Sequence, residues 1–205
     1  FHRERFDNFS NFARIGEGSL GGKGRGLAFL DNIIKHHPDM NAYEDMPVRI
    51  PKTVVLCTDI FDEFMETNDL YSLALSDVPD EEILRHFLKA HLPQRLADDC
   101  RAMMNVVSGP LAIRSSSLLE DSHYQPFAGI YSTYMIPPLD DQDARLELLG
   151  DAIKAVYASV YYKDSKAYMT ATSNVIDQEK MAVIIQEVVG QAHDTRFYPH
   201  ISGVA

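Results

Sequence analysis

The sequence predicts an α+β fold, and two kinds of segment indicate it. Runs of apolar and β-branched residues at 52–58, 111–114 and 181–189 are typical of strands. From Asp141 to about Tyr162, apolar residues recur at helical spacing. Because strands and helices are mixed along the chain without strict β–α–β alternation, the class is α+β or mixed α/β.

In the first half of the chain, helices predominate. A glycine-rich loop leads into a helix that stops at Pro38. The apolar face of this helix comprises Leu27, Leu30, Ile33 and Ile34. The strand at 52–58 is followed by a helix at 59–68. Further helices are predicted at 79–91, where a proline and three acids form a favourable first turn, and at 93–107.

The second half predicts four strands around one long helix. The strands are 111–114, 128–136, 181–189 and 197–205. The long helix should bury a stripe made of Leu149, Ile153, Val156, Tyr157, Val160 and Tyr161. The run at 181–189 is apolar on both faces, as expected for a strand covered on both sides, apart from its Gln-Glu pair.

Composition excludes several classes of function. The 205 residues carry a formal charge of -11, which argues against a general binder of nucleic acid or anionic membrane. Only two cysteines are present, both expected in the core, and no run suits a signal peptide or membrane span, so we expect a reduced, cytoplasmic protein. The opening "FHRERFDNF", without a methionine, favours a segment of a longer protein.

The stretch "EGSLGGKGRG" at 17–26 concentrates five glycines around Lys23. Backbone N–H groups at a helix start can cradle an anion, and a lysine adds a point charge. The first 26 residues also carry more basic than acidic side chains, which suits a small anionic ligand. The spacing is not that of a Walker A loop. A flexible arm with a helix cap explains the loop equally well.

A second candidate is "AIRSSSLLEDS", where a strand delivers Arg114 beside Ser115, Ser116 and a third serine. A guanidinium among hydroxyl groups suits phosphate, because it donates in a fixed fork. The alternative is a surface ion pair between Arg114 and Glu120 or Asp121.

Two weaker candidates lie on later strands. Gly129 would allow close backbone approach, and Thr133 shares its face of an extended segment, although a strand with a bulge would look the same. Gln186 and the backbone from Glu187 to Val189 could meet the edge of a base, or the two polar residues could point to solvent. The histidines show no metal-ligand spacing.

Taken in order, these motifs resemble the N-terminal nucleotide-binding domain of the phosphoenolpyruvate synthase and pyruvate phosphate dikinase family. The stretches that carry the resemblance cover most of the chain outside about 70–107. They are "LGGKGRGL", "RIPKTVVLCTDIFDEFM", "LAIRSSSLLEDSHYQPFAGIYSTY", "AIKAVYASVYYKDSKAY" and "MAVIIQEVV" with "ISGVA".

The resemblance implies an ATP-grasp-like fold with ATP between two α+β lobes. It implies that Lys23 and Arg114 contact the phosphates and that Gly129 and Thr133 belong to the loop that covers them. It places Gln186 near the adenine and ribose. The strand residues after it, Glu187 to Val189, would supply backbone contacts to the base. Ser115 and Ser116 are further candidates for phosphate contacts. Arg25 departs from the family, in which small or amide residues are common at this position, and it either adds a phosphate contact or faces solvent.

The resemblance also implies the reaction of the whole protein. ATP would phosphorylate a histidine on a separate domain, and that domain would pass the phosphoryl group to pyruvate or another acceptor. The Mg²⁺ ligands would lie beyond residue 205, so that residues 1–205 form a truncated domain with subregions of about 1–110 and 111–205. We expect that such a piece does not turn over ATP alone.

Two other functions remain open. The domain could serve as a nucleotide-sensing or interaction module within a regulatory protein. It could also belong to a carboxylate–amine ligase of the wider ATP-grasp group, which the "RSSS…FAG" pattern disfavours.

Overall fold

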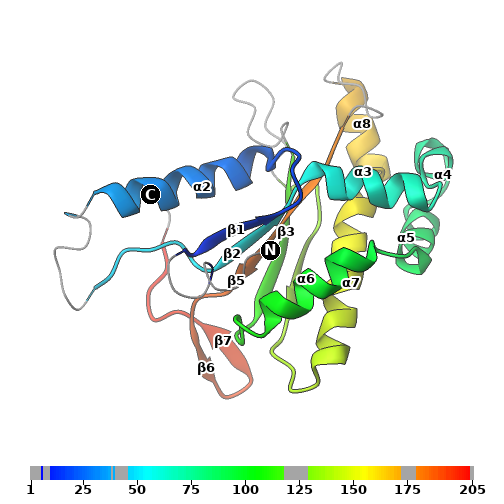
Figure 1. The fold of residues 1–205 in the computed structure, drawn as a ribbon. Helices are drawn as coiled ribbons and strands as arrows, with labels where there is room; N and C mark the ends of the chain where they lie inside the picture. Colours follow the sequence, from blue (N-terminus) through cyan, green and yellow to red (C-terminus); the bar gives the residue numbers. More distant parts are fainter. Residues whose placement is uncertain are drawn as a thin grey trace.

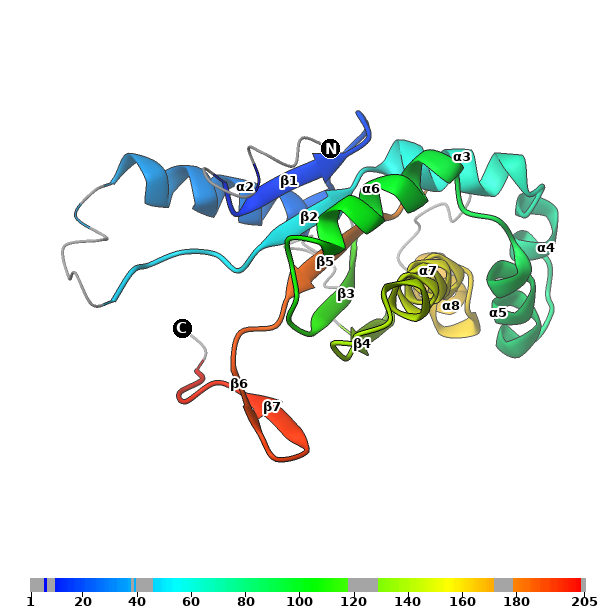
Figure 2. The same ribbon diagram turned by 60° about the horizontal axis from the view of Figure 1, so that its bottom comes forward.

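The α+β prediction is confirmed by a computed structural model of the chain. A five-stranded mixed sheet carries helices on both faces, and a two-stranded sheet projects from it in the turned view (Figures 1 and 2). The structure describes residues 6, 10–37, 39, 46–117, 129–171 and 179–203.

The main sheet has the strand order β1-β2-β5-β3-β4. β1 (Phe12–Ile15) is parallel to β2 (Thr53–Leu56), and β5 (Ala182–Glu187) is antiparallel to both β2 and β3 (Leu111–Ser116). β4 (Thr133–Ile136) pairs antiparallel with β3 at the edge. The middle strand is thus the apolar run that the sequence marks as covered on both faces, and residues 182–185 are buried.

One face of the sheet carries the main hydrophobic core. The helices on this side are α3 (Thr58–Thr67), α4 (Tyr71–Leu75), α5 (Asp80–Lys89), α6 (Gln94–Met104), α7 (Gln142–Ser159) and α8 (Lys163–Ala171). The stripe predicted for the long helix is confirmed, since all six of its residues are buried. Cys57 and Cys100 are buried as well, which confirms their core placement.

In the described part of the chain, one helix, α2 (Gly21–His36), covers the opposite face (Figure 1). Leu27 packs with Val55 and Ile184 of the sheet, but Leu30 remains 49% exposed. The predicted apolar face is therefore only partly buried. The physical reason is that α2 meets the sheet most closely with its glycine-bearing first turns. Farther along the helix Ile33 and Ile34 are half-buried, and Leu30 is exposed.

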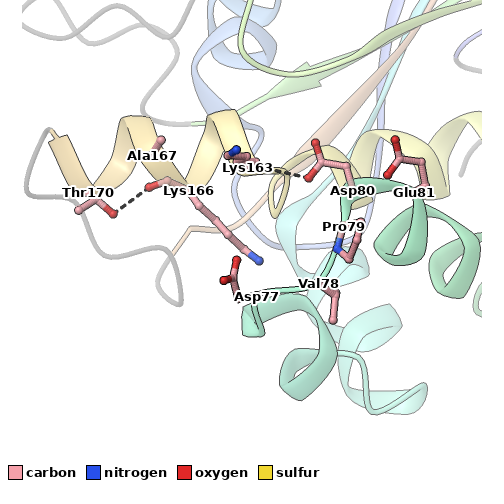
Figure 3. A pocket seen from close by; sticks show the side chains of 9 residues that line it. All are labelled: Asp77, Val78, Pro79, Asp80, Glu81, Lys163, Lys166, Ala167 and Thr170. Atoms are coloured by element: carbon pink, nitrogen blue, oxygen red, sulfur yellow. Dashed lines mark hydrogen bonds between the residues drawn. The ribbon is translucent and has the colours of Figure 1, made fainter.

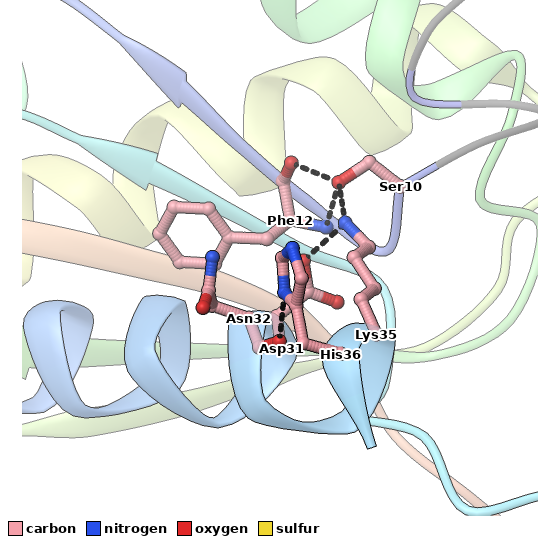
Figure 4. Close-up of polar contacts among 6 residues, drawn as sticks. All are labelled: Ser10, Phe12, Asp31, Asn32, Lys35 and His36. Atoms are coloured by element: carbon pink, nitrogen blue, oxygen red, sulfur yellow. Dashed lines mark hydrogen bonds and ion pairs between the residues drawn. The ribbon is translucent and has the colours of Figure 1, made fainter. Parts of the chain in front are cut away.

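The second half of α2 is fixed to β1 by polar contacts (Figure 4). Lys35 Nζ lies 2.5 Å from the Asp31 carboxylate and donates to Ser10 Oγ at 3.1 Å. The same Ser10 hydroxyl donates to the Phe12 carbonyl at 2.8 Å. The Asp31–Lys35 pair lies within α2, and the contact from Lys35 to Ser10 links the helix to the residues that lead into β1.

Two predicted strands are shorter in the structure. The segment predicted at 128–136 is a strand only from Thr133, because the chain turns at Gly129, where φ is +81°. The last strand is β7 (Arg196–Tyr198), which pairs with β6 (Gln191–His193) in a hairpin instead of extending through 205. Its last two predicted residues lie outside the described part of the chain.

Candidate functional site

The glycines at the start of α2 let the helix begin directly against the end of β3. Gly21 has φ +68°, and a Cβ atom there would lie 1.7 Å from the Ser116 carbonyl oxygen. The next amide, on Gly22, donates to the Ser117 carbonyl at 3.0 Å. The glycine cluster indicates that something comes close to the backbone here, and at Gly21 and Gly22 it is the backbone at the end of β3.

Ser116 locks this junction with its side chain. Its hydroxyl accepts from Gly24 N at 2.9 Å and donates to the Leu20 carbonyl at 2.8 Å, and the residue is fully buried. Ser115 is also buried and points to the opposite face of the sheet by strand alternation. The structure thus gives Ser116 a packing role, and the idea that either serine contacts phosphate stays a prediction.

The other side of the glycine loop is held by the first turn of α3. The Asp59 carboxylate accepts from Glu17 N at 3.0 Å and from Gly18 N at 2.9 Å. Thr58 Oγ1 accepts from Ser19 N at 3.0 Å. Partial burial raises the pKa of Asp59, but these N–H groups outweigh it and the net pKa is lowered. Asp59 and Thr58 are loop-holding residues that the sequence analysis missed. Their signal is a Thr-Asp pair opening a helix.

Strand register brings the predicted phosphate residues of β3 and β4 together. Arg114 is the direct partner of Thr133 on β4. Ser116, two residues on, shares the face of Arg114 and is the residue against which α2 begins. Arg114 is half-buried and Thr133 is exposed. As far as the described residues show, a ligand could therefore reach this part of the sheet face.

The two predicted lysine and arginine positions of α2 differ in exposure. Lys23 is half-buried in the first turn of α2, one residue after the Gly22 amide that binds β3. Arg25 is exposed on the same helix. Lys23 thus lies in the helix turn that packs against the end of β3, the strand that carries Arg114.

Gln186 lies on the same face near the other end of β3. It pairs with Ala112, which is four residues, or about 13 Å of strand, before Ser116. Its side-chain amide donates to Thr53 Oγ1 at 3.0 Å across the sheet. The alternative that Gln186 simply points to solvent is therefore wrong, because its side-chain amide is hydrogen-bonded to the neighbouring strand.

The chain after Gln186 is fixed through its backbone. Glu187 N donates to the Lys52 carbonyl, and Val188 N donates to the Pro110 carbonyl, both at 2.9 Å. A cavity of about 490 Å³ opens beside this segment. Glu187, Val188 and Val189 contribute to its lining, together with residues from 47–52 and Gly109. The predicted base-binding residues therefore border a hollow in the surface.

Gly129 occupies an exposed turn before β4, with open space around its Cα. Three residues later, Ser132 N donates to Ser159 Oγ at 3.3 Å. This hydrogen bond connects the turn to the end of α7. Glu120 and Asp121, the alternative partners proposed for Arg114, lie outside the described residues. Within the described ranges, Arg114 has no ion-pair partner.

A larger cavity, of about 630 Å³, lies between α8 and the start of α5 (Figure 3). Its charged groups serve the packing of these helices. Lys166 Nζ donates to the Ser76 carbonyl at 2.6 Å, and the Asp80 carboxylate accepts from Lys163 N at 2.8 Å. It lies in the helical layer, away from the face that carries Arg114, so we do not assign the ligand to it.

Two further searches cover only the residues that the structure describes. No group of three or more His, Cys, Asp or Glu side chains there is placed to hold a metal ion. No helix in that part of the chain is long and apolar enough to cross a membrane.

The glycine-bearing helix start and the arginine strand lie on one face of a mixed sheet in an α+β fold. The chain belongs to the pyruvate phosphate dikinase AMP/ATP-binding domain family, whose model matches residues 17–205. This confirms the family to which the sequence motifs point, and it makes an adenine nucleotide the class of ligand. A comparison with curated proteins found no significant match.

Proposed function

We propose that the sheet face beside α2 binds ATP in an ATP-grasp-like manner. Lys23 and Arg114 contact the phosphates, Thr133 and Gly129 border the phosphate-covering loop, and Gln186 meets the adenine and ribose. The backbone from Glu187 to Val189 would meet the edge of the base beside the 490 Å³ cavity.

The observation that supports this proposal most is the register of β3. It puts Arg114 opposite Thr133 and two residues before Ser116, against which α2 begins. Gln186, opposite Ala112 on the same face, is two residues or about 7 Å of strand from Arg114, and about 13 Å of strand separates it from Ser116 at the helix start. An extended nucleoside triphosphate spans that separation. The phosphates would then lie at the end with Lys23 and Arg114, and the base would lie at the end with Gln186.

In this proposal the residues act by neutralising and positioning charge. The Arg114 guanidinium donates in a fork to phosphate oxygens, and Lys23 adds a mobile positive charge. Both would offset the negative charge of the triphosphate and align it for phosphoryl transfer. The described residues include no cluster that fits Mg²⁺, and in this proposal its ligands lie beyond residue 205.

The whole protein, as we propose it, is a dikinase-like phosphotransferase. The β-phosphoryl group of ATP passes to a histidine nitrogen on another domain and AMP is released. The γ-phosphoryl group is transferred to water and leaves as phosphate, or to inorganic phosphate and leaves as pyrophosphate. That histidine then donates the group to pyruvate or another acceptor. Residues 1–205 supply the nucleotide site and do not turn over ATP alone.

Calorimetric titration with ATP tests the site. Lys23→Ala and Arg114→Ala should each weaken ATP binding by roughly tenfold or more, because each removes a charged phosphate contact. Arg85→Ala is the matched control, since Arg85 lies exposed on α5 in the helical layer. Wild-type affinity in both site variants would overturn the assignment.

A further inference from the structure

A buried arginine in α7 fixes the loop that leads into β3. Arg145 is 4% exposed, and its two terminal nitrogens donate to the carbonyls of Val107, at 2.9 Å, and Gly109, at 2.6 Å. Among the described residues its Nε has no hydrogen-bond partner. Burial lowers the pKa of Arg145, with no carboxylate there to oppose it. A buried guanidinium held only by carbonyls is costly, so its contacts must serve to hold that loop in place.

The loop held by Arg145 in turn contacts the end of β5. The Pro110 carbonyl accepts from Val188 N at 2.9 Å, one residue after the carbonyl that Arg145 binds. A Cβ atom on Gly109 would lie 3.3 Å from Glu187 Oε1, so the two segments are in close contact. Leu111 is the register partner of Glu187. A continuous path therefore runs from α7 through the loop to the strand exit.

We infer that Arg145 is a positioning residue for the nucleotide base, acting through Gly109 and Pro110 on the backbone of Glu187 to Val189. This rests on the proposed function, which places the base beside that backbone. Gly109, Glu187, Val188 and Val189 all border the 490 Å³ cavity, so a shift of the loop would reshape its wall. Arg145 itself need not touch the ligand.

The inference predicts a selective loss of affinity. In Arg145→Met, the affinity for ATP should fall roughly tenfold, whereas the affinity for inorganic tripolyphosphate, which has no base, should stay at the wild-type value. A merely structural role would weaken both ligands together or neither. The matched control is Arg101→Met, because Arg101 of α6 also contacts α7, through an exposed ion pair with Asp143, but does not hold the loop at 107–109.

Arg145→Lys carries the test if the methionine variant does not fold. It keeps the charge and one donor, so its loss of ATP affinity should be smaller, with tripolyphosphate binding again unchanged. Hydrogen exchange of the Val188 amide should also be faster in this variant, because its acceptor on Pro110 is held less firmly. An unaltered ratio of the two affinities, or an unaltered Val188 exchange rate, would overturn the inference.

The two proposals fail differently. A wild-type chain that does not bind ATP contradicts the proposed function, whatever Arg145 does. Normal ATP binding in a folded Arg145→Met chain contradicts only the positioning role.

Discussion

Gly21 and Ser116 lie so close that a single carbon atom cannot be placed between them. A Cβ atom on Gly21 would be 1.7 Å from the Ser116 carbonyl oxygen, and the φ angle of +68° is one that other residues rarely adopt. This contact joins α2 to β3 and sets where the proposed phosphate end of the site lies.

Gly21→Ala should therefore destabilise the chain by roughly 2 kcal/mol or more, because the backbone of Gly21 or that of Ser116 must move to make room for the methyl group. Urea unfolding followed by circular dichroism measures the change. The matched control is Gly26→Ala on the same helix, where a Cβ would meet nothing within 4 Å. That variant should gain roughly 0.5–1 kcal/mol from helix propensity. Equal effects at the two positions would contradict the contact.

Ser116→Ala should cost about 1–3 kcal/mol. The reason is that the buried hydroxyl serves two backbone groups, Gly24 N and the Leu20 carbonyl, and the alanine leaves both without that partner. Exposed Ser108 provides the control substitution, which should be nearly neutral. A cost at Ser116 no larger than at Ser108 would argue against the locking role.

Asp59 should make stability depend on pH in the acidic range. Its pKa is lowered in the folded chain from the ordinary value of 3.8, so its stabilising effect is present above about pH 4 and is lost as pH falls through the folded value. The stability advantage of wild type over Asp59→Asn should thus be constant at neutral pH and shrink below pH 3.8. An advantage that persists unchanged at pH 2 would be inconsistent with this role.

Neither cysteine should react in the folded chain. Burial raises the pKa of Cys57 to about 11 and that of Cys100 to about 12, and only the thiolate is nucleophilic. Labelling with a thiol reagent at pH 8 should be slow in buffer and rapid in urea, where both thiols are exposed. Fast labelling of one thiol under native conditions would show that the surrounding core opens readily.

The sequence predicts the elements with strong apolar patterns well. The stripe of α7 and the cores of β2, β3 and β5 lie where the periodicity puts them. β1 was missed because its four residues show no clear alternation and only Ile15 is buried. α8 was missed because few of its residues are buried.

The candidate site could be predicted only in part, because its residues contact partners that are distant in the sequence. The pattern of glycines indicates a close approach, but Ser116 lies 95 positions after Gly21, and no local signal pairs them. The exposure of Leu30 has the same origin, since α2 meets the sheet most closely with its first turns. No sequence pattern marks Arg145 as buried, because its partners are the carbonyls of Val107 and Gly109 in a loop more than 35 residues earlier.

The strand order has a consequence for how the chain folds. β5 is the last strand of the main sheet to be synthesised, yet it occupies the middle, where Gln186 joins Thr53 across 133 residues. Until residue 187 leaves the ribosome, β1 with β2 and β3 with β4 are two separate ribbons with open edges. Such late, non-local pairing slows folding. Refolding should therefore be limited by the insertion of β5, and the exposed edges of β2 and β3 would be the surfaces that chaperones must shield during synthesis.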